Sequence, residues 1–397
     1  MKKTALSALL LFALFLLGGC GGQEIESGLF VLSLAVDPAP DGNLTVTVKA
    51  LSGTKETDAA GNAAGSPEGA AAAQGGESPD AGLEAPEPGY IVLSATAKSC
   101  LRALSLLSAT TPRTVNLSQL REVVLSRTLA ESGAALSILR EIHAMYRANG
   151  EAVVVITPDD AGDFIRRQRA ILGVRLSQYL EVLFDHFAQM DTIPPRARLA
   201  EVISDMESAS ADALAVYAAG NTFHDTLSLP GAADTDRLPG HLPRTAPAEN
   251  EYLGSAMFSG GKMTGVLTGE ETGLLCLMTG SAKRRIAFIG DAQYKTNLPT
   301  RVRRRIDKET GALCVDIRMN LTRIAGGEDA NQNEIAAYIE QRCVSVLRKL
   351  QSAGCDAAGF GRIAVRSAID EEAFKRMDWQ TRYETAPVRT SARVKVL

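Results

Sequence analysis

The sequence predicts an α+β fold with mixed β-sheets, packed helices and two to three subdomains. Apolar β-branched runs alternate along the chain with stretches of helical spacing. The first two runs, residues 29–36 and 44–50, flank a turn rich in Pro and Gly, which indicates an antiparallel hairpin and therefore a mixed sheet. The 397 residues are 45% apolar and 22% charged, which is typical of globular domains with cores that need no disulfides.

The N-terminus carries the signals of an exported lipoprotein. Two lysines precede an apolar run at residues 5–17, which is shorter than the roughly 20 residues that a membrane-spanning helix needs. Leu17-Gly18-Gly19-Cys20 follows and resembles a lipobox, in which small residues fit the signal peptidase and the thiol accepts diacylglycerol. We therefore expect residues 1–19 to be a signal peptide and Cys20 to be the lipidation site.

Residues 20–222 are expected to form an N-terminal α+β domain. Its composition changes at residues 52–89, where Ala, Gly, Pro, Ser and Glu dominate and little apolar surface is available for burial, so this segment is predicted to be a disordered insertion. Asp159 and Asp160 are expected to cap a helix. Further strands are expected at 90–95, 120–125, 152–156 and 211–218, and helices at 96–108, 132–148, 161–171, 176–190 and 199–206.

Residues 223–250 are rich in Pro, Gly and Asp and are expected to be a linker to a C-terminal α+β domain at 251–397. A capping-box pattern at Thr268 to Glu271 predicts a short helix. A basic cluster follows at Arg301, Arg303, Arg304 and Arg305, which we interpret as a solvated turn or helix face. A hairpin is expected at 252–258 and 262–267, strands at 285–289, 313–319 and 392–397, and a long helix at 333–352.

The residues that carry chemistry are sparse. The net charge of -4 and the absence of a long basic run argue against a nucleic-acid partner. The histidines show no metal-ligand spacing, and neither a P-loop nor a nucleophile elbow is present, so we expect no catalytic residue, no metal and no cofactor. Several cysteines after Cys20 lie in apolar settings, and most are expected in the core, with a disulfide between Cys343 and Cys355 as the less favoured alternative. Trp379 is expected to be a core or edge anchor.

Several segments, in order, resemble the C subunit of bacterial spore germinant receptors, the GerAC family. Glu24-Ile25-Glu26 leads into the first apolar strand, which ends at Asp37. The helix-then-strand at 138–155 and the hairpin at 252–267 are similar to family segments. The stretch from Asp356 to Gly361 matches the Asp-x-x-Gly-Phe-Gly signature, and Trp379 with the closing strand matches the family's end. We expect the signature to shape a turn after the long helix, with Gly359 and Gly361 adopting backbone angles that other residues resist and Phe360 buried.

The resemblance implies a non-enzymatic, lipid-anchored subunit that acts with two integral membrane subunits, of A and B type, at the extracytoplasmic face of the spore inner membrane or cell membrane. There it would help nutrients to trigger germination. The alternative is an extracytoplasmic solute-binding lipoprotein of a transporter, against which the 5% aromatic content and the opening hairpin argue. A surface hydrolase is a third possibility, but no nucleophile, base or metal set supports it.

Overall fold

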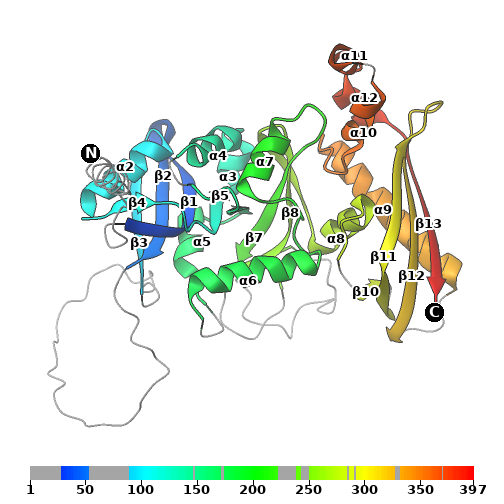
Figure 1. Cartoon of the computed structure of the whole chain (residues 1–397), viewed down its shortest axis with the longest axis horizontal. Coiled ribbons are helices and arrows are strands. Elements are labelled where there is room, and N and C mark those ends of the chain that lie inside the picture. The colour runs from blue at the N-terminus through cyan, green and yellow to red at the C-terminus, as the bar shows by residue number, and fades with distance from the viewer. Residues whose placement is uncertain are drawn as a thin grey trace, which may run out of the picture.

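The computed structural model describes residues 28–52, 89–145, 148–170, 174–221, 238–242, 250–283, 286–289, 292–326, 331–368 and 370–397. Two β-sheets follow one another along the long axis of the molecule, with helices packed against both (Figure 1). This arrangement confirms the predicted α+β class with mixed sheets. Cys20, nearly all of the predicted insertion and most of the predicted linker lie outside the described residues.

The larger sheet mixes parallel and antiparallel strands in the order β3-β2-β1-β5-β6-β7-β8-β9, with β4 pairing β1 at its side. The inner strands β1, β5, β6 and β7 run parallel, and hairpins extend the sheet at both edges. The strands are β1 (Gly28–Ala39), β2 (Asn43–Leu51), β3 (Tyr90–Ala97), β4 (Thr114–Asn116), β5 (Glu122–Ser126), β6 (Val153–Thr157), β7 (Leu214–Gly220), β8 (Asn250–Ser259) and β9 (Lys262–Leu267).

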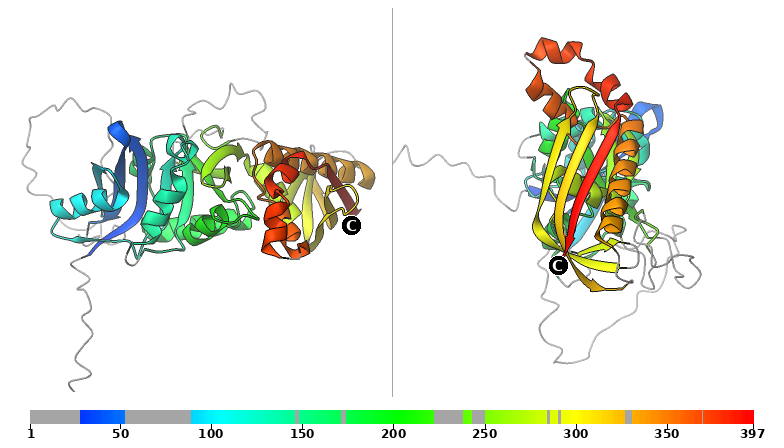
Figure 2. Two further views of the ribbon diagram at one scale, coloured as in Figure 1. Left: turned by 90° about the horizontal axis from the view of Figure 1, so that it is seen from above. Right: turned by 90° about the vertical axis from the view of Figure 1, so that its right-hand side faces the viewer.

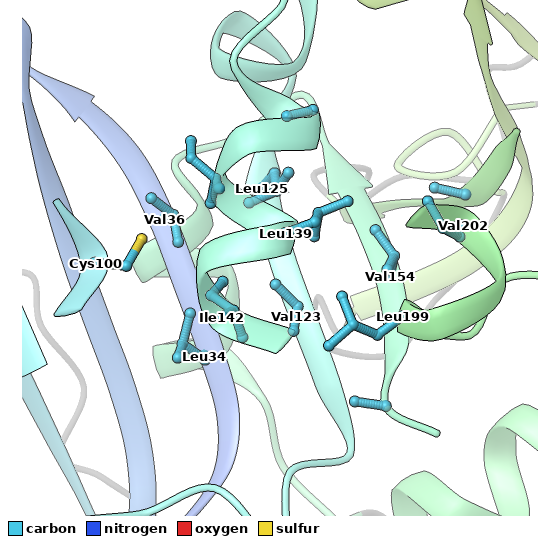
Figure 3. Packing of buried hydrophobic residues seen from close by; sticks show 14 of the residues in the cluster. Leu34, Val36, Cys100, Val123, Leu125, Leu139, Ile142, Val154, Leu199 and Val202 are labelled. Carbon is cyan, nitrogen blue, oxygen red and sulfur yellow. The ribbon is translucent and has the colours of Figure 1, made fainter. Parts of the chain in front are cut away.

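Helices cover both faces of this sheet. One face packs against α2 (Cys100–Thr110), α3 (Arg127–Glu131), α4 (Ala135–His143) and α7 (Leu199–Met206). In Figure 3, Leu139 and Ile142 of α4 lie among strand residues such as Val123. The other face packs against α5 (Ala161–Arg167) and α6 (Leu176–Gln189). Burial on both faces explains why the inner strands are continuous apolar runs rather than alternating ones.

The smaller sheet has the order β10-β11-β12-β13, with β13 parallel to β12 and the other pairs antiparallel. Its strands are β10 (Ile286–Ile289), β11 (Ala292–Ile306), β12 (Leu313–Ala325) and β13 (Val388–Val396). One face packs on a core shared with α8 (Gly269–Thr279), α9 (Gln332–Ser352), α10 (Phe360–Ser367), α11 (Glu371–Arg376) and α12 (Trp379–Thr385). Figure 2 shows this sheet at the end of the molecule that carries the C-terminus.

The predicted hairpin at 252–267 is present as β8 and β9, but it pairs with β7 in the larger sheet. The change from one sheet to the other therefore comes after residue 267, within the region predicted as the C-terminal domain. The capping box that starts α8 is confirmed: the Thr268 hydroxyl accepts from the Glu271 amide, and the Glu271 carboxylate accepts from the Thr268 amide.

Two sequence interpretations were wrong in detail. The basic cluster at 301–305 is neither a turn nor a helix but part of strand β11, whose pleat sends its arginines to opposite faces. The helix expected at 132–148 is shorter, because α3 ends at Glu131 and Gly133 adopts a left-handed φ of 88° before α4 begins. The helices α10, α11 and α12 were not predicted from the sequence.

No helix among the described residues is long and apolar enough to cross a membrane. The cysteines of the described residues are all buried and unpaired, namely Cys100, Cys276, Cys314, Cys343 and Cys355. Burial raises the pKa of the thiols of Cys100, Cys276 and Cys343 to about 12. These thiols therefore stay protonated at neutral pH and behave as small core residues.

Candidate functional site

The signature segment Asp356 to Gly361 connects α9 to α10 at the place where the two sheets meet. Its first residue, Asp356, makes most of the contacts, and its carboxylate is almost completely buried. Oδ1 accepts a hydrogen bond from the Phe360 amide at 3.0 Å, and Oδ2 accepts from the Gly361 amide at 2.5 Å and from Trp379 Nε1 at 3.1 Å. Asp356 therefore caps the first turn of α10, because the N-cap residue Gly359 has no side chain to do so.

Burial raises the pKa of Asp356 to about 6, although its three hydrogen-bond donors favour the ionised form and oppose the shift. The carboxylate is thus held at a point where a change of one or two pH units alters its charge. Its neighbours Tyr383 and Cys355 also have raised pKa values, for which burial is the first cause. Tyr383 donates a hydrogen bond from its hydroxyl to the Cys355 carbonyl at 2.9 Å, which joins α12 to the same loop.

The two glycines of the signature serve different purposes. Gly359 has a left-handed φ of 72°, as the sequence predicts. Gly361 lies inside α10 without a positive φ, so the expected role of its backbone angles is wrong. A Cβ at Gly361 would instead lie 2.5 Å from the Ser210 carbonyl oxygen and 2.6 Å from Trp379 Nε1. Glycine is needed there because α10 approaches the backbone that leads into β7.

Asp212, immediately before β7, links the signature to the larger sheet. Its Oδ2 accepts from the Asp356 amide at 2.8 Å, and its Oδ1 accepts from the Gly260 amide in the β8–β9 turn at 3.1 Å. Burial raises the pKa of Asp212, and these two backbone hydrogen bonds oppose the shift. One carboxylate thus joins the start of β7, the β8–β9 turn and the loop before α10.

The contacts that Asp356 and Asp212 make between α10 and the larger sheet form a joint between the two sheets. Ion pairs between arginines and Asp205 strengthen this joint. Arg362 of α10 contacts Asp205 of α7 through Nη2 and Oδ1 at 2.6 Å, and Arg196 contacts the other oxygen of Asp205 through Nε at 3.1 Å. Arg304, on the inner face of β11, donates to the Ala358 carbonyl. Burial and the nearby Arg362 and Arg366 lower the pKa of Arg304, while Asp356 opposes the shift.

These residues line a pocket of about 350 Å³ between the two sheets. The carboxylates of Asp205, Asp212 and Asp356 already accept hydrogen bonds from backbone amides, an indole or guanidinium groups. Within the described residues, no group of three or more His, Cys, Asp or Glu side chains could hold a metal ion. The arrangement is therefore suited to fixing the position of one sheet against the other. Among the described residues that line the pocket, no nucleophile is paired with a base.

A second polar cluster lies inside the larger sheet, at the face covered by α5 and α6. Gln168 donates from Nε2 to Glu122 and, at 2.8 Å, to the Tyr252 hydroxyl, while its Oε1 accepts from Ser33 at 3.1 Å. The Lys49 ammonium donates to the Gln168 carbonyl at 2.5 Å. Burial raises the pKa of Glu122, and all of these side chains are buried. The cluster is internally satisfied, which is the condition under which buried polar groups are tolerated.

The structure tests some of the residue roles predicted from the sequence and leaves others untested. Phe360 is completely buried, and Trp379 is buried as a core anchor, so both expectations are confirmed. The helix cap at Asp160 is confirmed by its hydrogen bond from the Asp163 amide at 2.9 Å, whereas Asp159 accepts from Gly220. Cys20 lies outside the described residues, so its lipidation stays a prediction.

The roles of Asp212, Asp205 and Arg362 do not follow from the sequence, because their partners are far away in the chain. The bond between Asp212 and Asp356 spans 144 residues, and the bond between Asp205 and Arg362 spans 157. No local pattern signals such pairs. A signal did exist for Arg304: the alternation from Arg301 to Ile306 has the period of a strand, which would have placed Arg304 on the face of Val302 and Ile306.

Comparisons with known proteins find two family models and a solved structure to which the chain is similar. Residues 21–219 match the family described as spore germination protein N-terminal domain, and residues 253–397 match the family described as spore germination B3/GerAC like, C-terminal. A solved structure titled "Crystal Structure of the GerBC protein" is similar over 92% of this chain and 96% of that chain, with 11% identity and a TM-score of 0.48. No curated protein sequence matches the chain.

Proposed function

This chain belongs to the GerAC-like family of spore germination proteins, and we propose that it is the lipid-anchored, non-enzymatic C subunit of a nutrient germinant receptor. The observation that carries this proposal is the match to both family domains, in order, over residues 21–219 and 253–397. In this role the protein helps nutrients to trigger germination by binding its partners through surface complementarity. Two integral membrane subunits, of A and B type, are the partners.

The lipid on Cys20 supplies the membrane attachment in this proposal. A positive N-terminus, an apolar run at 5–17 and Gly18-Gly19 before Cys20 support it. A single acyl chain gives only marginal membrane binding, whereas the chains of a diacylglycerol give stable anchoring. We propose that the mature protein is held at the extracytoplasmic face of the spore inner membrane.

The joint at Asp356 supports a role without catalysis. Its carboxylates hold backbone amides and arginines of the protein itself, and its aromatic residues are packed in the core. Such a joint fixes the orientation of the two sheets relative to each other. A subunit needs this if a surface on each sheet is to contact partner proteins at the same time. Loss of the joint should therefore impair assembly before it affects any chemical step.

The proposal is tested by affinity purification of the tagged protein from detergent-solubilised spore membranes, with mass spectrometry of the co-purified proteins. We expect two integral membrane proteins to co-purify with the wild-type chain. The Phe360→Ala variant should recover less of both, while Val365→Ala on the exposed side of the same helix should recover them fully. Recovery of transporter subunits in place of receptor subunits would contradict the proposal and favour the solute-binding alternative.

A further inference from the structure

The outer face of the smaller sheet, which is the face opposite the core, is densely cationic. In β11 the pleat points Arg301, Arg303 and Arg305 to this face, while Val302 and Ile306 pack toward the core. The neighbouring strands continue the pattern with exposed cations of their own. These are Arg318 in β12 and Arg389, Arg393 and Lys395 in β13. The concentration stands out because the chain as a whole has a net charge of -4.

The strand register places three of these arginines side by side. Arg301 of β11 pairs with Arg318 of β12, and Arg318 pairs with Arg393 of β13. Directly paired residues have Cβ atoms about 5 Å apart, and like charges at such positions destabilise a sheet. The row is therefore unfavourable for the protein alone and would be relieved by a bound anion.

The described residues supply no counter-ion for this row. Across the described part of the chain, no carboxylate lies within ion-pairing distance of Arg301, Arg303, Arg318 or Arg393. Two acids lie near this face. Asp307 lies 3.4 Å from Arg305, and Asp316, opposite Arg303 in the strand register, lies 3.5 Å from Arg305 and accepts a hydrogen bond from Ser391 at 2.8 Å. Asp316 is thus engaged at the side of the row and does not neutralise it.

The row also lines a hollow in the surface. A pocket of about 410 Å³ is bordered by Arg301, Arg303, Arg318 and Arg393, together with Asp316 and Ser391. Four guanidinium groups around one hollow offer paired N–H donors in a fixed fork, which matches the oxygens of a phosphate group better than a single ammonium does. The geometry points to a phosphate-binding site on the outer face of the smaller sheet, filled by the phosphate of an anionic lipid headgroup or by a free phosphate compound.

This inference does not depend on the proposed receptor function, because it follows from the register and the charges alone. The two sources of phosphate predict different binding. A lipid headgroup would be recognised only on a vesicle surface, where each arginine near anionic lipid adds about 1 kcal/mol. A free phosphate compound would saturate the site in solution.

The test uses the full chain carrying Cys20→Ala, so that no lipid is attached, and measures two kinds of binding. One arm is co-sedimentation with vesicles of phosphatidylcholine alone or with added phosphatidylglycerol. The other arm is calorimetric titration with inorganic phosphate. We expect binding in at least one arm, and the triple variant Arg301→Gln/Arg318→Gln/Arg393→Gln should weaken it roughly a hundredfold, since three arginines are lost. Residues 5–17 are common to all variants, so the vesicles of phosphatidylcholine alone measure binding by that apolar run, and the quantity compared is the increase on adding phosphatidylglycerol.

A matched control removes the same charge elsewhere: Arg102→Gln/Arg348→Gln/Arg376→Gln changes three exposed arginines on α2, α9 and α11. It should bind as the parent does. A second variant, Arg301→Lys/Arg318→Lys/Arg393→Lys, keeps the positive charges but loses the paired N–H donors of the guanidinium groups. It should bind at least several-fold more weakly than the parent. Equal binding by the parent and the glutamine variant would overturn the proposal. Equal loss in the control, or no binding of either probe, would overturn it as well.

Discussion

The larger sheet is covered by helices on both faces, whereas the helices of the described ranges cover one face of the smaller sheet. Their charged residues differ accordingly. Glu122 and Lys49 lie inside the larger sheet with partners from the protein itself, while Arg301, Arg318 and Arg393 face solvent and lack carboxylate partners among the described residues. The comparison indicates that the charges of the larger sheet are satisfied within the protein, whereas the smaller sheet presents a charged surface to a ligand.

The joint at Asp356 connects these two regions and shares properties of both. It is buried like the scaffold, yet arginines from both sides converge on its pocket. We therefore expect substitutions to affect stability most at the joint, less in the buried cluster and least on the outer face of the smaller sheet. The order of these effects can be measured, and any reversal would break the comparison.

The largest effect is expected for Phe360→Ala at the joint. Phe360 is 0% exposed, and truncation of a buried Phe costs about 3 kcal/mol or more, through lost burial and the cavity that remains. Urea denaturation gives the change in the free energy of unfolding. Val365→Ala on the same helix is the control: its side chain is 41% exposed, so we expect a loss below about 0.5 kcal/mol. Equal losses in the two variants would show that the joint is not packed as described.

The next effect is a pH dependence at Asp356. Its pKa is raised to about 6 in the folded protein, compared with 3.8 as the usual value, so the folded state binds the proton more tightly. This tighter proton binding stabilises the folded state by at most about 3 kcal/mol. The stabilisation is complete below pH 3.8 and is lost as the pH rises through about 6. Burial also raises the pKa of Asp37, Glu122 and Asp212, so these groups also make the stability fall as the pH rises.

The part due to Asp356 is isolated by comparing the wild type with Asp356→Asn. Urea denaturation at a series of pH values from 4 to 7 should show a smaller loss of stability with rising pH in the variant. The absolute stability of the variant is not the readout, because Asn also changes the cap of α10. Parallel curves for the two proteins would contradict the raised pKa of Asp356.

A smaller loss is expected for Gln168→Leu in the buried cluster. The change removes the donor to Glu122 and Tyr252 and the acceptor for Ser33, and an unsatisfied buried polar group costs about 1–3 kcal/mol. We expect a loss of about 2 kcal/mol by urea denaturation, because the Leu side chain recovers some burial. Gln178→Leu on the exposed side of α6 should be nearly neutral. A neutral Gln168→Leu would mean that the cluster does not stabilise the larger sheet.

The smallest effect, with the opposite sign, is expected on the outer face. Arg318→Gln removes the middle charge of the row and should raise stability by a few tenths of a kcal/mol at low salt, since it relieves like-charge repulsion. Arg305→Gln should lower stability slightly, because Arg305 pairs with Asp307 at 3.4 Å and with Asp316 at 3.5 Å. Thermal unfolding at low and high salt measures both changes. Destabilisation by Arg318→Gln would indicate a partner for Arg318 within the protein.

Much of the fold could be predicted from local patterns. The long helix at 333–352 has apolar residues on one face and corresponds to α9, and the hairpins follow from alternating runs beside Gly- and Pro-rich turns. Strand β11 was not predicted because Arg304, at a core-facing position, makes the alternation from Arg301 to Ile306 look like a continuous basic run. The helices α10 to α12 are short, and their burial depends on the joint rather than on a long apolar stripe.

The site was less predictable than the fold. The turn and the buried Phe360 follow from the glycines and the aromatic residue of the signature, which are adjacent in the chain. The partners Asp212 and Asp205 come from the larger sheet and its helix α7, and only tertiary structure brings them to Asp356 and Arg362. The phosphate site is of the same kind, because strand register, not sequence proximity, aligns Arg301 with Arg318 and Arg393.

The most direct test of the central claim is nutrient-triggered germination of spores in which this protein belongs to the only receptor present. With all other receptors removed, deletion of the gene should abolish the nutrient response, while a receptor-independent trigger should still cause germination. Restoring the wild-type gene should restore the response. An unchanged nutrient response after the deletion would contradict the receptor assignment.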